Sequence, residues 1–216
     1  ILPIPVAFHW RHHKKAGNYS MSETWKNPLK GWYNKPDTKV VVKGSKIIMK
    51  APVGSDCWLK TRQGLWQQRS INNAPFHWEK IEGNFQAVVQ VSGGLGHDAD
   101  KAGLMVRLDN EHWIFTGMEY HNESIHHATS VALDTSDWCI APLPENAEKV
   151  GVWFCFKRTG EIYECFYSLD GVKWVQTRQG QFTDQPLLYV GIACACPAGN
   201  EFRVTFESYK SAPLST

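Results

Sequence analysis

The sequence predicts an all-β protein whose strands form one antiparallel sandwich or barrel. Many short segments alternate between apolar and polar residues, which is the period of a half-buried strand. Turn-forming residues separate these segments at regular intervals, and almost no stretch has a helical period. The pattern gives about eleven or twelve strands, a number typical of an antiparallel sandwich or barrel. At 216 residues, of which 43% are hydrophobic, the chain suits a single domain with a large core.

The clearest pair of strands spans residues 102–108 and 113–121. One face of this pair is apolar and consists of Leu104, Val106, Leu108, Ile114, Met118 and Tyr120. The opposite face carries Met105, Arg107, Trp113, Phe115, Glu119 and His121. A face that only meets solvent would hold threonine, serine and lysine, whereas this face mixes aromatic rings with a cation and a carboxylate. We therefore expect it to bind a ligand.

The other strands follow from the same alternation and from turn signals. Residues 43–46 read Lys-Gly-Ser-Lys, and Asp170 precedes Gly171 between two strand-like runs; both are hairpin signals. In chain order, further strands are expected at residues 40–42, 47–49, 56–61, 85–92, 129–133, 150–157, 162–168, 187–194 and 202–209. Residues 1–35 are broken by prolines, so we expect an irregular segment that wraps onto the sandwich. The sandwich domain then covers residues 36–210, and residues 211–216 form a tail.

Composition excludes several classes of function. The net charge of +2 is too balanced to indicate binding to nucleic acid or to an anionic membrane. No run of about 18 apolar residues is present, so no membrane-spanning helix is expected. The six cysteines favour reduced core thiols in a cytoplasmic protein, because several alternate with large hydrophobic residues inside strands. Glycosylation sequences beginning at Asn18 and Asn122 are common by chance and argue only weakly for secretion.

A series of motifs adds a family resemblance. In order along the chain, these are Ser-Asp-Cys-Trp at 55–58, Ala-Gly-Leu-Met-Val-Arg at 102–107, Ser-Asp-Trp at 136–138 and Ser-Leu-Asp-Gly at 168–171. In this order and spacing the sequence resembles the fungal "regulation of enolase" proteins and related bacterial domains, over about residues 36–210. The resemblance implies a concanavalin A-like jelly-roll sandwich without agreed catalytic residues. For the fungal branch it implies an intracellular protein that affects the glycolytic enzyme enolase. The sequence departs from the expected pattern at Cys57, where an aromatic residue is expected, and in its histidine-rich residues 121–127.

The sequence offers little support for catalysis. A glycosidase needs two carboxyl groups on either side of the scissile bond, and the expected ligand face supplies only Glu119. We expect Glu119 to pair with Arg107 as an orienting or structural ion pair, with Asp56 or Asp137 left open as a second acid. No nucleophile motif, nucleotide-binding loop or cofactor site is apparent.

Metal binding was weighed in the same way. Two groups of histidines occur in the sequence, namely His9, His12 and His13, and His121, His126 and His127. Neither group has the spacing of a zinc site, so we interpret them as solvated or edge residues. The residues from His97 to Asp100 lack the acidic pattern of a calcium loop and are interpreted as a plain turn.

The sequence thus predicts a non-enzymatic binding or regulatory protein without a cofactor. Its partner is either the glycolytic enzyme enolase or a small sugar or sugar phosphate, and its oligomeric state is open. A carbohydrate-binding module and a glycan-active enzyme are the alternatives, and both would use the same face. The predicted ligand-binding residues are Trp58, Met105, Arg107, Trp113, Glu119, His121, Ser130 and Trp138, with Trp58 and Trp138 as stacking walls.

Overall fold

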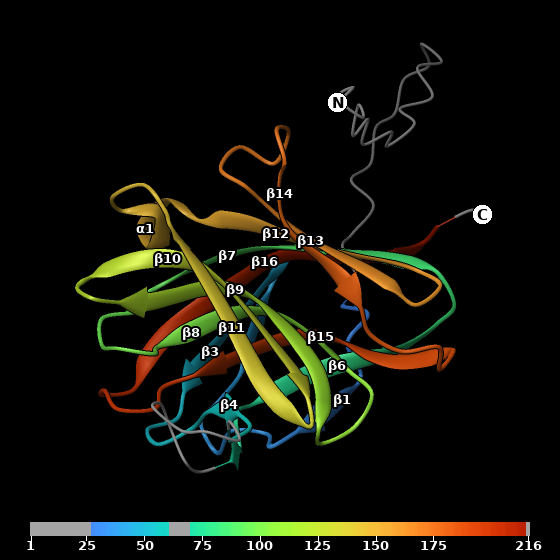
Figure 1. Cartoon of the computed structure of the whole chain (residues 1–216). Coiled ribbons are helices and arrows are strands. Elements are labelled where there is room, and N and C mark those ends of the chain that lie inside the picture. The colour runs from blue at the N-terminus through green and yellow to red at the C-terminus, as the bar shows by residue number, and fades with distance from the viewer. Residues whose placement is uncertain (1–26, 61–69, 215–216) are drawn as a thin grey trace.

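Two seven-stranded antiparallel sheets stack face to face in the computed structural model, which describes residues 27–60 and 70–214 (Figure 1). Sheet A consists, from edge to edge, of β1 (Gly31–Tyr33), β6 (Phe76–Glu82), β15 (Leu187–Ala195), β8 (Lys101–Arg107), β9 (His112–His121), β10 (Ser124–Leu133) and β11 (Thr135–Pro142). Sheet B consists of β14 (Val175–Gln181), β13 (Ile162–Ser168), β12 (Val152–Thr159), β7 (Phe85–Gly93), β16 (Phe202–Pro213), β3 (Lys46–Ala51) and β2 (Val41–Lys43). A two-stranded ribbon of β4 (Cys57–Trp58) and β5 (Ile71–Asn72) and one short helix, α1 (Ala147–Val150), complete the described elements.

The order of the strands confirms the jelly-roll class of β-sandwich. Strands that follow one another in the chain often lie in different sheets, as β6 and β7 do, so the chain passes back and forth between the layers. Within each of the two sheets, every strand pairs with its neighbours in the antiparallel direction.

The main core lies between the two sheets. Leu104, Val106 and Ile114 from sheet A are no more than 1% exposed and pack in one cluster with Phe154 and Val204 from sheet B. These sheet A side chains belong to the face that alternation predicted to be buried, which confirms the inner face of the central pair.

Most predicted strands are confirmed, but β1, β5, β6, β11 and β14 were not predicted. β6 carries His77, Glu79 and Lys80 among its apolar residues, and β14 is the edge strand Val-Gln-Thr-Arg-Gln-Gly-Gln, so neither has an apolar stripe from which a strand would be predicted. β1 lies within residues 1–35, which were expected to be irregular, and forms the edge of sheet A by pairing with β6. Short edge strands with few apolar residues give almost no periodic signal.

A second apolar layer lies on the outer face of sheet A, the face turned away from sheet B. Residues 53–59, here called the covering segment, cross this face. Val53 forms a bridge with Cys196, which directly follows β15, and the Leu59 N–H donates to Ser136 Oγ on β11 at 2.8 Å. The segment buries Cys57 and Leu59 against Met105, Trp113 and Phe115 of the sheet. The outer face is therefore partly roofed rather than fully open to solvent.

Candidate functional site

The strand register places the predicted ligand face on the outer side of sheet A. Met105 pairs with Phe115, Phe115 pairs with Ser130, and Ser130 pairs with Trp138, so four adjacent strands contribute to one row of side chains. Residues that pair directly across a sheet project to the same face. The register therefore brings these predicted residues onto one surface.

The covering segment fills the centre of this surface. Met105 is 1% exposed and Trp113 is 0% exposed, because Cys57 and Leu59 of the covering segment pack on them. Burial raises the pKa of the Cys57 thiol to about 12, against the smaller opposing effect of the Lys101 charge. A thiol with this pKa is protonated at neutral pH and packs as a small apolar group. Cys57, the departure from the expected aromatic residue, thus packs the covering segment onto the outer face.

A buried ion-pair cluster lies at one end of the face, formed by Asp56, Lys101 and Glu119. Lys101 Nζ is 3.1 Å from Asp56 Oδ1 and 4.0 Å from Glu119 Oε2, and all three side chains are no more than 5% exposed. Trp138 Nε1 donates to Glu119 Oε2 at 3.3 Å. Burial by itself lowers the pKa of Lys101, but the charges of Glu119 and Asp56 together raise it above its ordinary value. The ammonium therefore remains charged and joins the covering segment to the sheet.

The expected ion pair between Arg107 and Glu119 is wrong. Lys101 is the residue that faces Glu119 in the register, whereas Arg107 faces Trp113. Lys101 and Arg107 are six positions apart along β8, which corresponds to about 20 Å at the usual rise of a strand. Arg107 and Glu119 consequently lie at opposite ends of the outer face.

The structure also shows where Asp56 and Asp137, the two possible second acids, lie. Asp56 shares Lys101 with Glu119 and is 1% exposed. Asp137 alternates with Trp138 along β11 and points away from the outer face, toward Arg178 of β14. Arg178 donates to both Asp137 oxygens, at 3.0 and 2.8 Å, and these hydrogen bonds lower the pKa of Asp137. Asp137 thus joins the edges of the two sheets and does not lie beside Glu119.

The histidines of residues 121–127 divide between two environments. His121 lies on the outer face, where its ring meets the Trp138 ring edge-on at 5.3 Å and the His126 ring at 6.0 Å. His127 alternates with His126 and enters the main core, where it is 1% exposed, so the expectation of a solvated or edge residue was wrong for this position. His9, His12 and His13 lie outside the described residues. In the described part of the chain, no three His, Cys, Asp or Glu side chains form a metal-binding group.

Several buried polar atoms of the outer face and of the covering segment have no hydrogen-bond partner among the described residues. They are Asp56 Oδ2, Trp58 Nε1, Trp113 Nε1 and Ser130 Oγ. Such atoms are uncommon in proteins, because a buried polar group without a hydrogen bond costs about 1–3 kcal/mol. The outer face and the covering segment therefore have unused donors and acceptors.

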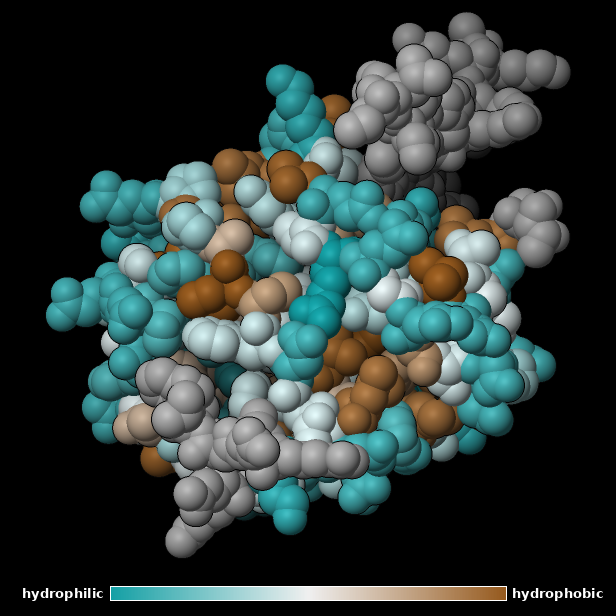
Figure 2. Space-filling view, viewed as in Figure 1, coloured by the Kyte–Doolittle hydropathy of each residue, from teal (hydrophilic) through white to brown (hydrophobic). Residues whose placement is uncertain are grey.

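An aromatic groove of about 260 Å³ lies at the other end of the outer face, beside Arg107. We define it by Trp32, Tyr33, Trp78, Tyr189, Arg107 and Asn110. The Trp78 and Tyr189 rings meet edge-on at 4.7 Å, and the Arg107 guanidinium lies 4.0 Å from the centre of the Tyr33 ring. Figure 2 shows hydrophobic residues gathered over β15 and β6, in the lower right part of the view, with hydrophilic residues around them. Aromatic walls with a few placed polar groups are typical of small-molecule sites.

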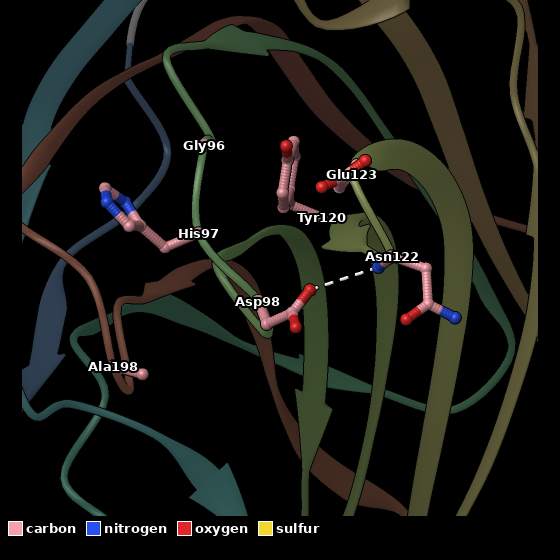
Figure 3. A pocket seen from close by; sticks show the side chains of 7 residues that line it. All are labelled: Gly96, His97, Asp98, Tyr120, Asn122, Glu123 and Ala198. Carbon is pink, nitrogen blue, oxygen red and sulfur yellow. Dashed lines mark hydrogen bonds between the residues drawn. The ribbon is translucent and has the colours of Figure 1, made fainter.

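A second hollow, of about 640 Å³, opens where the loop before β8 meets the turn between β9 and β10 (Figure 3). Asp98 Oδ1 accepts a hydrogen bond from the Asn122 N–H at 3.1 Å, which ties the loop to the turn. Asp100 closes the loop from inside, because its Oδ2 accepts the N–H groups of Gly96 and His97. These contacts are those of a loop stabilised by its own side chains, as the turn interpretation of residues 97–100 expected.

Most of the chain matches a known protein family. The family model described as "Protein of unknown function (DUF1349)" matches residues 32–214, which is most of the chain. The chain belongs to this family. It is also 26% identical over 184 residues to "Regulation of enolase protein 1" of Saccharomyces cerevisiae, covering 85% of this chain and 89% of that protein. The family resemblance that was drawn from the sequence motifs is thereby confirmed.

Solved structures confirm the fold of this DUF1349 protein. A crystal structure of a functionally unknown protein from Saccharomyces cerevisiae superposes with a TM-score of 0.79 at 24% identity, covering 86% of this chain and 97% of that one. An engineered GH43 glycoside hydrolase superposes with a TM-score of 0.63 at 14% identity, covering 99% of this chain. This chain spans only 44% of the length of that hydrolase. At these identities the likeness shows the jelly-roll fold alone.

Sequence reasoning missed Lys101 and most of the groove. Lys101 has the same parity as Met105 and Arg107, so extending the predicted strand by one residue would have placed a cation opposite Glu119. Tyr33, Trp78 and Tyr189 come from β1, β6 and β15, which are far apart in the sequence. No local pattern in the sequence indicates that these three rings meet.

Proposed function

We propose that this protein is a non-enzymatic binding protein that regulates a glycolytic enzyme. The observation that carries the proposal is the position of Lys101, whose ammonium is buried between the carboxylates of Asp56 and Glu119. Asp56 and Glu119 are the acidic side chains at the Lys101 end of the described outer face. Both of them are used to hold the covering segment on the sheet. The cluster supports a role in shaping a binding surface.

The same cluster argues against glycoside hydrolysis. A glycosidase places two carboxyl groups on opposite sides of the bond that it breaks, about 5–9 Å apart and open to the substrate. Here the two carboxylates bind one cation, Lys101, and are 1% and 4% exposed, and neither of them lines the aromatic groove that Arg107 enters. The described outer face therefore supports binding rather than general acid–base catalysis.

Enolase is the proposed target, on the strength of the name of the yeast relative. The six thiols agree with a cytoplasmic location for such a role, because all six are free and five of them are buried. No helix among the described residues is long and apolar enough to cross a membrane.

A small sugar is the second proposed ligand, because the aromatic groove favours it. Flat rings such as Trp78 and Tyr189 stack on the apolar faces of a pyranose, while Arg107 and Asn110 can bond its hydroxyl groups. The volume of about 260 Å³ suits a monosaccharide rather than a long glycan. Binding of such a ligand would provide a signal for regulating a carbohydrate pathway.

The regulatory proposal is tested by measuring purified yeast enolase in steady-state assays over a series of concentrations of this protein. We expect a saturable change in kcat or KM and a complex detectable by calorimetry. Trp138→Ala removes a side chain that is 38% exposed on the outer face and should weaken the effect. Val172→Ser alters a side chain that is 75% exposed beyond β13 of sheet B and should leave the effect intact. If enolase kinetics stay constant and no complex forms at micromolar concentrations, the regulatory proposal fails.

A further inference from the structure

Two arginines of the described chain are buried to the same extent but have different partners. Arg107 and Arg158 are each 5% exposed. Arg158 donates four hydrogen bonds to backbone carbonyl oxygens, those of Gly160, Thr183, Gln185 and Pro186. A guanidinium has five N–H donors, so Arg158 is almost fully used by the fold. Arg107 is not.

The contacts of Arg107 leave donors unused. Its Nε donates to the Asp109 carbonyl oxygen at 2.6 Å, and its Nη2 donates to Asn110 Oδ1 at 2.7 Å. The Tyr33 ring covers the guanidinium at 4.0 Å, Tyr33 is also its side-chain hydrogen-bond partner, and the charge of Asp109 acts on it from a greater distance than an ion pair. No described carboxylate lies within ion-pair distance of Arg107. A buried charge without a counter-ion is costly, and a ligand that supplies one recovers that cost.

The charges around the aromatic groove also favour an anion. Lys80 Nζ lies 5.7 Å from the centre of the Tyr189 ring, at the wall of the groove. Burial lowers the pKa of His77, against the opposing effect of its hydrogen bond with the Gly31 carbonyl oxygen, and the charge of Lys35 adds to the lowering, so the imidazole is neutral. The opposing charge is Asp109, whose carboxylate is already bound by His112 Nδ1 at 2.8 Å and by the N–H groups of Glu111 and His112.

We propose that the aromatic groove binds a small ring-bearing anion whose carboxylate or phosphate group pairs with Arg107 while its ring packs against Trp78 and Tyr189. The planar guanidinium matches the oxygens of either group, and hydrogen bonds between charged partners are about twice as strong as neutral ones. The inference rests on the ligand-binding part of the proposed function and is independent of the regulation of enolase. It narrows the ligand from sugars in general to acidic sugars or sugar phosphates.

Calorimetric titration of the full chain tests the inference with three probes: glucose, glucuronate and glucose 6-phosphate. Glucuronate replaces the CH₂OH of glucose with a carboxylate, so any gain in affinity measures the added anion. We expect at least one of the two anions to bind about 10- to 100-fold more tightly than glucose, the range of one charged hydrogen-bonded contact. The difference between glucuronate and glucose 6-phosphate identifies which anionic group the groove prefers.

Three variants locate the effect. Asn110→Asp is nearly isosteric and places a carboxylate where Asn110 Oδ1 now contacts Arg107, so it should satisfy the guanidinium internally, preserve the fold and abolish the preference for anions. Arg107→Gln should reduce anion affinity to that of glucose. Arg203→Gln removes the same charge from an exposed position on β16 and should bind like the wild type. If Arg107→Gln does not fold, the affinity of Asn110→Asp for the anions decides whether the guanidinium is the binding group.

Where the probes bind, three outcomes would overturn the inference: equal affinity for glucose and both anions, undiminished anion binding by Asn110→Asp, or equal weakening by Arg203→Gln. The first would still leave sugar binding in place. An absence of binding by all three probes would contradict both the anion site and the sugar ligand, whereas the enolase assay would remain a separate test of regulation.

Discussion

His127 should make the stability of this protein depend on pH. Its Nε2 lies 3.1 Å from Thr116 Oγ1 and 3.4 Å from Thr177 Oγ1, and its ring stacks on Tyr167 at 5.5 Å. The groups that surround the imidazole in the main core are threonine hydroxyls and aromatic rings, and burial lowers its pKa to about 4. Replacing it by glutamine removes this titration while leaving a polar side chain beside Thr116.

The size of the effect follows from the two pKa values. Because the folded pKa of about 4 lies below the value of 6.5 for an exposed histidine, the unfolded chain binds the proton more tightly. The free energy of unfolding is therefore highest above pH 6.5 and falls as the pH drops through this window. Linkage gives a loss of about 2 kcal/mol between pH 7 and pH 5, and of about 3.4 kcal/mol in total below pH 4.

The assay is urea unfolding of the wild type and of His127→Gln at a series of pH values from 7.5 to 4.5. The difference in unfolding free energy between the two proteins should shrink by about 2 kcal/mol between pH 7 and pH 5. His126→Gln, on the outer face of the same strand, is the control and should retain the wild-type pH dependence. A difference between wild type and His127→Gln that stays constant with pH would refute the reasoning, as would an NMR titration of His127 with a midpoint near 6.5.

Three further predictions concern stability and reactivity. Lys101→Met should lower the free energy of unfolding by about 3–5 kcal/mol, because it leaves two buried carboxylates without their cation; adding Glu119→Gln should recover part of this loss in the same urea assay. Gly117→Ala should destabilise the protein by more than about 2 kcal/mol in a thermal melt, because the new Cβ would collide with the backbone of Ala102 and Gly103. Gly94→Ala is the control: its new Cβ meets no atom within 4 Å, so this variant should unfold like the wild type. The Cys57 thiol should resist a thiol reagent at pH 8 until urea unfolds the chain, because its pKa is about 12; reaction at the rate of a free thiol in the folded protein would contradict this.

The fold was largely predictable because alternation is a local property. Leu104 and Val106 alternate with Met105 and Arg107, and this two-residue period alone separates the inner face of β8 from the outer face. β14 was not predictable, because an exposed polar edge strand is specified by the strand beside it rather than by its own residues.

The candidate site was predictable only in part. Alternation assigned Arg107 and Glu119 to one face correctly, but their separation along that face depends on register, which pairs Glu119 with Lys101. The role of Asp56 depends on the path of the covering segment, which no local pattern describes. His127 shows the same limit, because a histidine that alternates with apolar residues gives no sign of how completely the opposite sheet will cover it.

By itself, the sequence determined that this protein is an antiparallel sandwich, which face of its central strands is apolar, and which family it resembles. These properties are repeated in every strand and motif, so each can be recognised within a few consecutive residues. Only the tertiary structure decided that Lys101 joins Asp56 to Glu119 and that Tyr33, Trp78 and Tyr189 surround Arg107. Those contacts join residues that are tens of positions apart, and they form only when two sheets and a crossing segment are packed together.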